Sequence, residues 1–309
     1  MGRARVAVAP RATDELTGAV VAGGGELVDA TDADAIVWTD PAHPEALTEL
    51  LTTSSATWIQ LPFAGIEKFV AAGTIDDAHT WTCAKGIYGP STAEHALALL
   101  LAAARRLNVH IRSATWLGRP GRGAPERRLG ASTVAIVGGG GIGSSLIEML
   151  RPLRTEVIVV NRSGDPVPGA ARTVKVDSLV EVLGLADFVA IAAAATPETH
   201  RMFNATRFEA MKDDAWLINV ARGSLVDTNG LVDALRAGTI GGAALDVTDP
   251  EPLPDGHPLF ELANAIITPH VANTWDMALP VLAGLVERNV AAFGRGDPLE
   301  GLVDPALGY

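Results

Sequence analysis

The sequence predicts an α/β protein of two domains, one of them built around a Rossmann-type, doubly wound parallel sheet. Three observations carry this prediction. A glycine-rich turn lies between a strand pattern and a helix pattern, further strand and helix patterns alternate after it, and the length of 309 residues exceeds that of a typical single domain.

The glycine-rich turn lies in the run Val134 to Gly143, which reads Val-Ala-Ile-Val-Gly-Gly-Gly-Gly-Ile-Gly. Its spacing matches Gly-x-Gly-x-x-Gly, where the glycines allow a tight turn, a close approach to pyrophosphate and close packing of helix on strand. With 32 glycines in the chain, an ordinary glycine-rich turn is the alternative, and the flanking strand and helix argue against it. The expected dinucleotide contacts are Gly138, Gly140, Gly141, Ile142 and Gly143.

From residue 133 onward, short apolar runs alternate with helix patterns. Runs that are apolar throughout indicate strands buried on both faces, hence a parallel sheet covered by helices. Six strands are expected, at Thr133–Val137, Val157–Val160, Asp187–Ala193, Ala215–Val220, Gly241–Val247 and Ala265–Thr268. Helices are expected at Ile142–Leu150, Ser178–Leu183, Thr206–Met211 and Asn229–Arg236.

The first 90 residues predict a small α/β unit of their own. Its strands are expected at Val6–Ala9, Ala35–Trp38 and Thr57–Leu61, with a helix at Pro44–Leu51. A capping box at Ser91-Thr92-Ala93-Glu94 then predicts the start of an apolar helix from His95 to Leu107. Another helix is expected from Trp275 to Phe293.

Composition narrows the function classes. The net charge of −12 argues against a nucleic-acid binder, and we find no apolar run of the ~20 residues that span a bilayer. The single cysteine, Cys83, excludes a disulfide framework within the chain and lacks a cysteine partner for a metal, so we expect the cytoplasm and no metal. The arginine-rich loop Leu117–Arg128 is interpreted as a solvated loop or an arm for self-association.

The end of the second Rossmann strand indicates which dinucleotide is bound. NAD-binding units carry an Asp or Glu there, which accepts hydrogen bonds from the ribose hydroxyls. Here the residues are Asn161, Arg162 and Ser163, which lack that acid and can bind a 2′-phosphate. We therefore expect NADP(H) to be preferred, with NAD(H) possible.

Three side chains at or beyond strand ends suggest the chemistry. Arg222 follows a strand at the edge where α/β sheets bind ligands, and its guanidinium suits a carboxylate. His270 follows another strand, and Glu251 lies on a proline-rich loop. A carboxylate beside a histidine stabilises the imidazolium, which can then donate a proton near neutral pH. The three together predict a site that binds a 2-oxo acid and protonates its carbonyl oxygen.

At these residues the sequence resembles the D-isomer-specific 2-hydroxyacid dehydrogenases, and the resemblance covers nearly the whole chain. It implies that Arg222, Glu251 and His270 are catalytic, with the arginine also binding substrate. The motifs that carry it are Ala93-Glu-His-Ala-Leu, the glycine fingerprint, Thr196-Pro-Glu-Thr, Asn219-Val-Ala-Arg-Gly, Leu245-Asp-Val with Pro250-Glu-Pro-Leu-Pro, and Thr268-Pro-His.

The resemblance also implies further site residues. Cofactor contacts are expected at Thr196, Val220, Ala221 and Asp246, the last beside the nicotinamide carboxamide. Backbone amides of Ala64 and Gly65 are expected to bind the substrate carboxylate. Asn273, with Phe63 and Trp275, departs from residues common in the family and can alter substrate choice. Trp116 is expected either to pack locally or to line a neighbouring subunit's cleft.

The family's chain path implies that the Rossmann domain, expected at residues 96–276, is inserted into a flavodoxin-like catalytic domain of residues 1–95 and 277–309. It also implies a homodimer. The leading hypothesis is an NADPH-dependent reductase of small 2-oxo acids such as glyoxylate or hydroxypyruvate, giving the D-2-hydroxy acid. The alternatives are an NAD-dependent, phosphoglycerate-type dehydrogenase and a dinucleotide-sensing binding protein without turnover.

Overall fold

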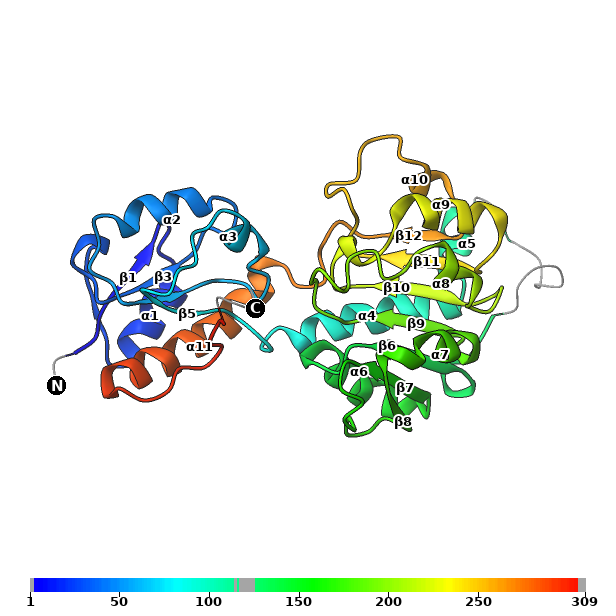
Figure 1. The fold of residues 1–309 in the computed structure, drawn as a ribbon, viewed down its shortest axis with the longest axis horizontal. Coiled ribbons are helices and arrows are strands. Elements are labelled where there is room, and N and C mark those ends of the chain that lie inside the picture. Colours follow the sequence, from blue (N-terminus) through cyan, green and yellow to red (C-terminus); the bar gives the residue numbers. More distant parts are fainter. Residues whose placement is uncertain (1–2, 114–115, 117–125, 305–309) are drawn as a thin grey trace. The chain divides into compact units, whose positions relative to one another are not determined.

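The computed structural model describes residues 3–113, 116 and 126–304, which form two compact units (Figure 1). The smaller unit combines residues up to Tyr88 with those from Thr274 onward, and the larger unit runs from Gly89 to Asn273. Both joints come just before the first residues of helices, Gly89 and Trp275, and the boundaries expected from the sequence, after residue 95 and before residue 277, stay a prediction.

The larger unit contains a seven-stranded parallel sheet in the order β12-β11-β10-β9-β6-β7-β8. Reading outward from β6 in both directions gives the doubly wound order of a Rossmann domain, with its switch point between β6 and β9. Its strands are β6 Thr133–Val137, β7 Glu156–Asn161, β8 Arg172–Lys175, β9 Phe188–Ile191, β10 Trp216–Asn219, β11 Gly242–Leu245 and β12 Ala265–Ile267.

The Rossmann-type fold expected from the sequence is therefore confirmed, with one strand more than expected. The additional strand, β8, lies at the edge of the sheet and pairs only with β7. Its residues are polar at both ends and none is fully buried, so it lacks the continuous apolar run by which the other strands are recognised.

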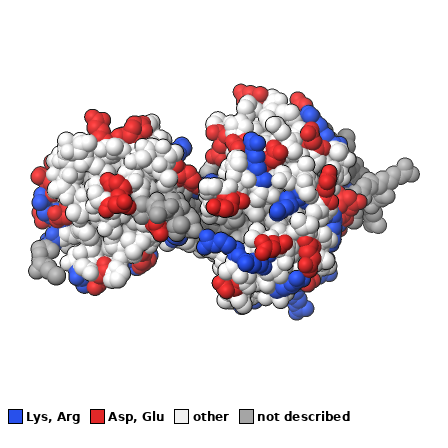
Figure 2. Space-filling view, viewed as in Figure 1, with Lys and Arg blue, Asp and Glu red and all other residues white. Residues whose placement is uncertain are grey.

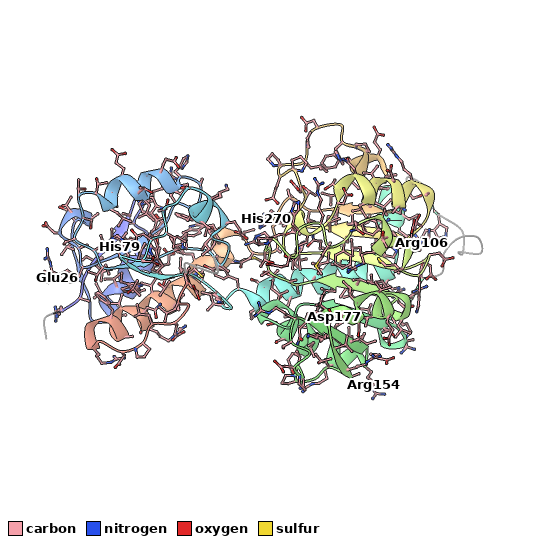
Figure 3. The ribbon with its side chains drawn as sticks, in the orientation of Figure 1. Glu26, His79, Arg106, Arg154, Asp177 and His270 are labelled. Carbon is pink, nitrogen blue, oxygen red and sulfur yellow. The ribbon has the colours of Figure 1, made fainter. Side chains whose placement is uncertain are left out.

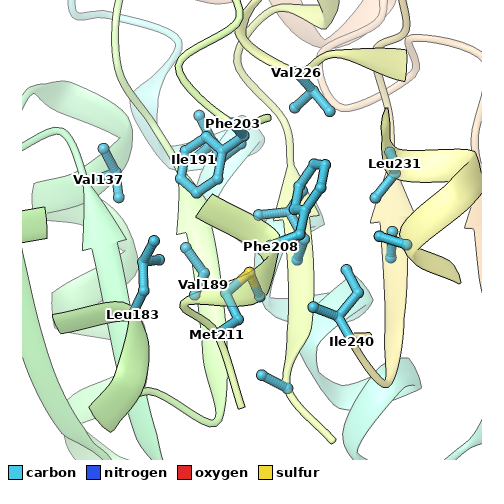
Figure 4. Packing of buried hydrophobic residues seen from close by; sticks show 14 of the residues in the cluster. Val137, Leu183, Val189, Ile191, Phe203, Phe208, Met211, Val226, Leu231 and Ile240 are labelled. Atoms are coloured by element: carbon cyan, nitrogen blue, oxygen red, sulfur yellow. The ribbon is translucent and has the colours of Figure 1, made fainter. Parts of the chain in front are cut away.

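Helices cover both faces of this sheet, and each face has its own apolar core. Phe203, Phe208 and Leu231 belong to the core on one face, under α7, α8 and α9 (Figure 4). The other core lies under α4 and α6. The helices of this unit are α4 Gly89–Ala104, α5 Leu107–Arg112, α6 Gly141–Leu150, α7 Leu179–Leu185, α8 Ala205–Glu209, α9 Thr228–Ala237 and α10 Pro258–Glu261.

Helix α4 begins at Gly89, which corrects the expected capping box. Ser91 and Thr92 lie inside the first turns rather than before the helix, and the expected single helix ends at Ala104, with α5 following as a separate helix. Gly89 packs so closely on Gly141 that a Cβ there would overlap the Gly141 carbonyl. This close contact allows the start of α4 to lie against the start of α6, beside the glycine-rich loop.

The smaller unit contains a five-stranded parallel sheet in the order β2-β1-β3-β4-β5, which is the flavodoxin-like order. Two of its strands, β2 and β5, were not expected, because β2 has only two residues, both exposed, and β5 has only three residues. The strands are β1 Arg5–Ala9, β2 Glu26–Leu27, β3 Ala35–Trp38, β4 Trp58–Gln60 and β5 Thr80–Thr82, and the helices are α1 Asp14–Ala22, α2 Pro44–Leu51, α3 Glu67–Ala71 and α11 Trp275–Arg295.

Helix α11 returns from the far end of the chain to complete this unit. It is the one described helix that is long and apolar enough to cross a membrane, and in this fold it packs its apolar residues, such as Leu282 and Val286, into the core with α1. Its fully buried Asn289 donates to Gln60 Oε1 (3.0 Å) and accepts from the Glu300 amide (2.8 Å). A polar network thus connects α11 to the sheet inside the core.

Surface charge follows the acidic composition. On the face drawn in Figure 2, acidic and basic side chains are interspersed over both units, and acidic ones predominate. Most of the arginine-rich loop, with Arg119 and Arg122, lies outside the described residues. Near the end of the loop, Arg127 has a structural role, because its guanidinium binds the carboxylates of Asp187 and Asp214 within the larger unit.

We expect Asn289→Ala to destabilise the smaller unit by roughly 1–3 kcal/mol, because the Gln60 carbonyl loses a donor and the Glu300 amide loses an acceptor. Urea denaturation monitored by tryptophan fluorescence measures the change. The control is Arg295→Ala, at the last residue of the same helix, which removes an exposed ion pair with Asp297. It should lower the free energy of unfolding by well under about 1 kcal/mol. Equal effects of the two substitutions would contradict the role given to the network.

Candidate active site

The glycine-rich loop leaves β6 at the switch point of the larger sheet, where α/β proteins bind ligands. Gly138 has φ 114°, a conformation that side chains rarely adopt, and a Cβ there would overlap the Ala192 carbonyl. A Cβ on Gly143 would overlap the Gly138 carbonyl oxygen. The first and third glycines therefore have the packing roles that the fingerprint requires.

The second glycine provides open space for a ligand. Gly140 is the N-cap of α6, provides no capping side chain, and has no atom within 4 Å of the place where a Cβ would lie. The amides of Gly141, Ile142 and Gly143 precede the first intrahelical hydrogen bond, which Ser144 donates to Gly140. Amide donors at the positive end of a helix beside an open cradle fit a dinucleotide pyrophosphate.

The residues expected to select the dinucleotide lie at the last residue of β7 and in the turn that follows it. Asn161 Oδ1 accepts from the Gly164 amide (2.5 Å), and its Nδ2 donates to the Asp165 carbonyl (2.9 Å). The Asn161 side chain therefore holds the turn, while Arg162 and Ser163 are exposed. Of the three residues, Arg162 and Ser163 are therefore the two whose polar side chains lie at the surface, where a dinucleotide could reach them.

Three other residues expected to contact the cofactor, Thr196, Val220 and Ala221, lie in the turns after β9 and β10. The Thr196 amide donates to Thr199 Oγ1 (2.8 Å), which shapes the turn after β9. A hydrogen bond with Thr196, and to a smaller degree the charge of Arg162, lowers the pKa of the exposed Glu198. Val220 and Ala221 are buried after β10, so contact with a ligand there would run through their backbone.

Arg222 is held at the end of β10 by a buried asparagine. Asn219 is fully buried, its Nδ2 donates to the Arg222 carbonyl (2.8 Å), and its Oδ1 accepts from the Ala221 amide (3.1 Å). The Arg222 guanidinium donates through Nη1 to the Ala221 carbonyl (2.7 Å) and is half-buried. The sequence analysis did not assign Asn219 a role, although a buried amide at a strand end is the signal for one.

Glu251 and His270 form a hydrogen-bonded pair. His270, labelled in Figure 3, lies on the loop after β12, and its Nδ1 lies 2.6 Å from Glu251 Oε1. Half of the imidazole surface is exposed. With Nδ1 turned to the carboxylate, Nε2 is left as the nitrogen that can exchange a proton with a ligand.

Asp246, at the end of β11, is fully buried and anchors the loop that carries His270. Its Oδ1 accepts from Thr268 Oγ1 (2.7 Å) and the Val271 amide (2.9 Å), and its Oδ2 accepts from the Ala272 amide (3.0 Å). Burial alone would raise the pKa of Asp246, but hydrogen bonds from His95, Thr268 and the two amides lower it to about 2. Asp246 thus has a structural task besides the nicotinamide contact expected for it, which stays a prediction.

His95 contacts both Thr268 and Asp246. It comes from α4, and its Nε2 lies 2.9 Å from Thr268 Oγ1 and 3.3 Å from Asp246 Oδ1. The only signal in the sequence was a histidine inside an otherwise apolar helix.

Asn273 is the last residue of the larger unit, and its Oδ1 accepts from the hydroxyl of Ser91 on α4 (2.7 Å). The two segments at which the chain enters and leaves this unit are therefore connected to each other. The amide oxygen of Asn273 is therefore already used in a contact within the protein. The influence on substrate choice expected for Asn273 stays a prediction.

The expected substrate loop, Ala64 and Gly65, belongs to the smaller unit and follows β4. Tyr88 donates its hydroxyl to the Pro62 carbonyl (2.7 Å), which fixes the start of the loop, and burial raises the pKa of Tyr88. The rings of Phe63 and Trp275 lie 5.8 Å apart, and that of Tyr88 lies 6.1 Å from Phe63. Both departures from the family pattern thus form one aromatic cluster beside this loop.

Some expected residues lie outside these groups. Trp116 is almost fully exposed to solvent in the described part of the chain, and the role expected for it stays a prediction. Within the described part of the chain, no three His, Cys, Asp or Glu side chains gather as they would around a metal ion.

We expect Asp246→Asn to destabilise the larger unit by about 2 kcal/mol at neutral pH. The reason is that the pKa of Asp246 is lower in the folded protein than in the unfolded chain, so its ionised form stabilises the fold. The stabilisation is complete above the ordinary pKa of 3.8 and is lost as the pH falls toward about 2. Hydrogen exchange of β11 and β12 amides at several pH values measures it. A difference from the unaltered protein that stays constant between about pH 7 and 3 would contradict this account.

Comparison with known proteins identifies the family. Residues 97–272 match the model of the D-isomer specific 2-hydroxyacid dehydrogenase NAD binding domain. The chain is 41% identical over 305 residues to an uncharacterised protein of Corynebacterium melassecola, covering 96% of this chain and 97% of that one. It is 37% identical over 214 residues to the glyoxylate reductase of Pyrococcus furiosus, covering 67% of this chain and 63% of that enzyme.

Among solved structures, the NADPH-dependent glyoxylate/hydroxypyruvate reductase of Sinorhizobium meliloti has the same fold, with a TM-score of 0.83 and 24% identity over 99% of this chain and 100% of that one. The family match covers the glycine loop, the strand ends and the Glu251–His270 pair. The chain therefore belongs to the D-isomer-specific 2-hydroxyacid dehydrogenases, which are NAD(P)-dependent oxidoreductases.

Proposed function

We propose that this enzyme reduces a small 2-oxo acid of the glyoxylate or hydroxypyruvate type to the D-2-hydroxy acid, with NADPH as the preferred reductant. The observation that carries the proposal is the contact of 2.6 Å between His270 Nδ1 and Glu251 Oε1, on the unit that also holds the glycine loop. The match to the Pyrococcus glyoxylate reductase supports the substrate class.

In the proposed reaction, His270 supplies the proton. Glu251 accepts the hydrogen bond of Nδ1–H, which orients the ring so that its Nε2–H can donate to the substrate. The acceptor is the carbonyl oxygen of the 2-oxo acid, which becomes the hydroxyl. In the reverse direction, neutral His270 takes the proton from that hydroxyl.

Arg222 binds and orients the substrate in this proposal. A guanidinium can bind a carboxylate, or a carboxylate and the adjacent carbonyl oxygen, through two parallel hydrogen bonds. Because Asn219 holds the backbone on both sides of Arg222, the guanidinium is delivered from a rigid strand end. Arg222 also favours the negative charge that develops on the carbonyl oxygen.

The glycine loop, with Gly138, Gly140 and Gly143, is the cradle we assign to the dinucleotide, whose nicotinamide supplies the hydride for C2 when it is bound. The role expected for the backbone amides of Ala64 and Gly65, binding of the substrate carboxylate, stays a prediction. The homodimer expected from the sequence stays a prediction.

Turnover with a panel of 2-oxo acids and both reduced dinucleotides tests the function. We expect His270→Asn to lower kcat by about 10²–10⁴-fold, the usual contribution of a positioned acid, and Arg222→Ala to lower kcat/KM by ~100-fold or more. Matched controls are His43→Asn and Arg236→Ala, both on exposed residues. A folded, dinucleotide-binding protein that turns over none of the acids would contradict the proposal and favour a dinucleotide sensor.

Cofactor preference has its own test. We expect NADPH to be bound more tightly than NADH, and Arg162→Ala to weaken NADPH by about tenfold with little effect on NADH, because a charge-assisted contact is worth about 1.5–3 kcal/mol. The nearby Glu198 offsets part of the Arg162 charge, so Glu198→Gln should strengthen NADPH binding. Fluorescence titration of the reduced dinucleotides measures both. Tighter binding of NADH by the unaltered protein would favour the NAD-dependent alternative.

A further inference from the structure

We propose that His95 is a positioning residue for His270, acting through Thr268 and Asp246. The inference rests on the proposed role of His270 as the proton donor. His270 lies on an exposed loop, and His95 of α4 helps to keep that loop in one position.

The first step is the direction of the hydrogen bonds. Thr268 Oγ1 lies 2.7 Å from Asp246 Oδ1, and because an ionised carboxylate only accepts, the hydroxyl donates. The remaining partner of that hydroxyl, His95 Nε2 at 2.9 Å, must then be its donor. His95 therefore carries a proton on Nε2, which also approaches Asp246 Oδ1 at 3.3 Å.

The second step leads from Asp246 to the loop of His270. The Asp246 carbonyl accepts from the His270 amide (2.8 Å), and its carboxylate accepts from the amides of Val271 and Ala272. One residue thus fixes three consecutive amides. Because both carboxylate oxygens are used, a rotation of this side chain would release the amides of Val271 and Ala272.

The third step is the conformation of His270 itself. Its φ of 53° lies in the left-handed region, which costs a side-chain-bearing residue about 1 kcal/mol or more and persists only where neighbouring contacts fix it. Asp246 provides those contacts. His95 and Thr268 in turn restrain the rotamer of Asp246, since Thr268 Oγ1 and His95 Nε2 lie 2.7 Å and 3.3 Å from its Oδ1.

Burial makes His95 effective in this task. The side chain of Asp246 is fully buried and that of His95 is four-fifths buried, so their contact is little screened by water. Loss of the donor would leave the Thr268 hydroxyl underused and one side of a buried carboxylate less well satisfied. The loop would then sample other positions, and the imidazole would meet the substrate less often in the reactive geometry.

The experiment compares His95→Phe, which keeps a ring but removes the donor, with His95→Gln, which keeps an N–H group near the Nε2 position. We expect His95→Phe to lower kcat about 10- to 100-fold while KM for the 2-oxo acid and for NADPH changes less than about twofold. His95→Gln should recover most of the lost kcat. Thr268→Val should resemble His95→Phe, and the double variant should be no slower than the slower single variant, because both break the same chain.

The matched control is His110→Phe. His110 also pairs through Nε2 with a carboxylate of the larger unit, that of Glu126, but on the exposed surface of α5. Its kcat should equal that of the unaltered enzyme. If His95→Phe does not fold, Thr268→Val and Thr268→Ser provide the same comparison, since serine keeps the hydroxyl and should retain activity.

The inference is overturned if His95→Phe keeps full kcat, or if Phe and Gln variants lose activity equally, since a purely structural role predicts no rescue by a donor. A failure of the proposed function gives a different result. In that case His270→Asn retains turnover, or no acid is turned over by the unaltered protein, whatever the His95 variants do.

Discussion

The buried carboxylate of Asp246 is the interaction on which the site depends. A charge removed from water must be balanced by donors, and in this fold the donors come from two separate stretches of chain, α4 and the segment that directly follows β12. The hydrogen bonds that stabilise this charge therefore hold the two stretches together. The same hydrogen bonds position the loop that carries His270.

The parallel sheet explains why the glycine loop, Arg222, Asp246 and His270 all lie at the same edge. Its strands all run in one direction, so the glycine loop after β6, Arg222 after β10, Asp246 after β11 and His270 after β12 emerge at one edge. At each of these places a short-range device fixes the exit: a glycine with positive φ, the buried amide of Asn219, or the carboxylate of Asp246. The residues to which we assign the chemistry therefore lie at strand ends and not within the strands.

Sequence patterns predicted the elements that are apolar or that carry an unusual backbone requirement. Strand β6 matches its expected bounds, and the fingerprint glycines have the steric roles expected of them. Polar or very short elements, such as β8 and β2, have no such pattern and were missed. The start of α4 was misplaced because Ser91 looks like a cap, whereas its hydroxyl bonds Asn273, 182 residues away. Pairings of that kind depend on tertiary structure, which also explains why His95 had no assignable partner in the sequence.

The return of α11 to the smaller unit has a consequence for synthesis of the chain. The residues of the larger unit leave the ribosome before Leu282, Val286 and Asn289, yet the core of the smaller unit, started at Val6, is incomplete without them. The inserted Rossmann unit can therefore fold before the smaller unit is complete. Until α11 emerges and packs against them, the apolar surfaces of the N-terminal strands stay open to chaperones.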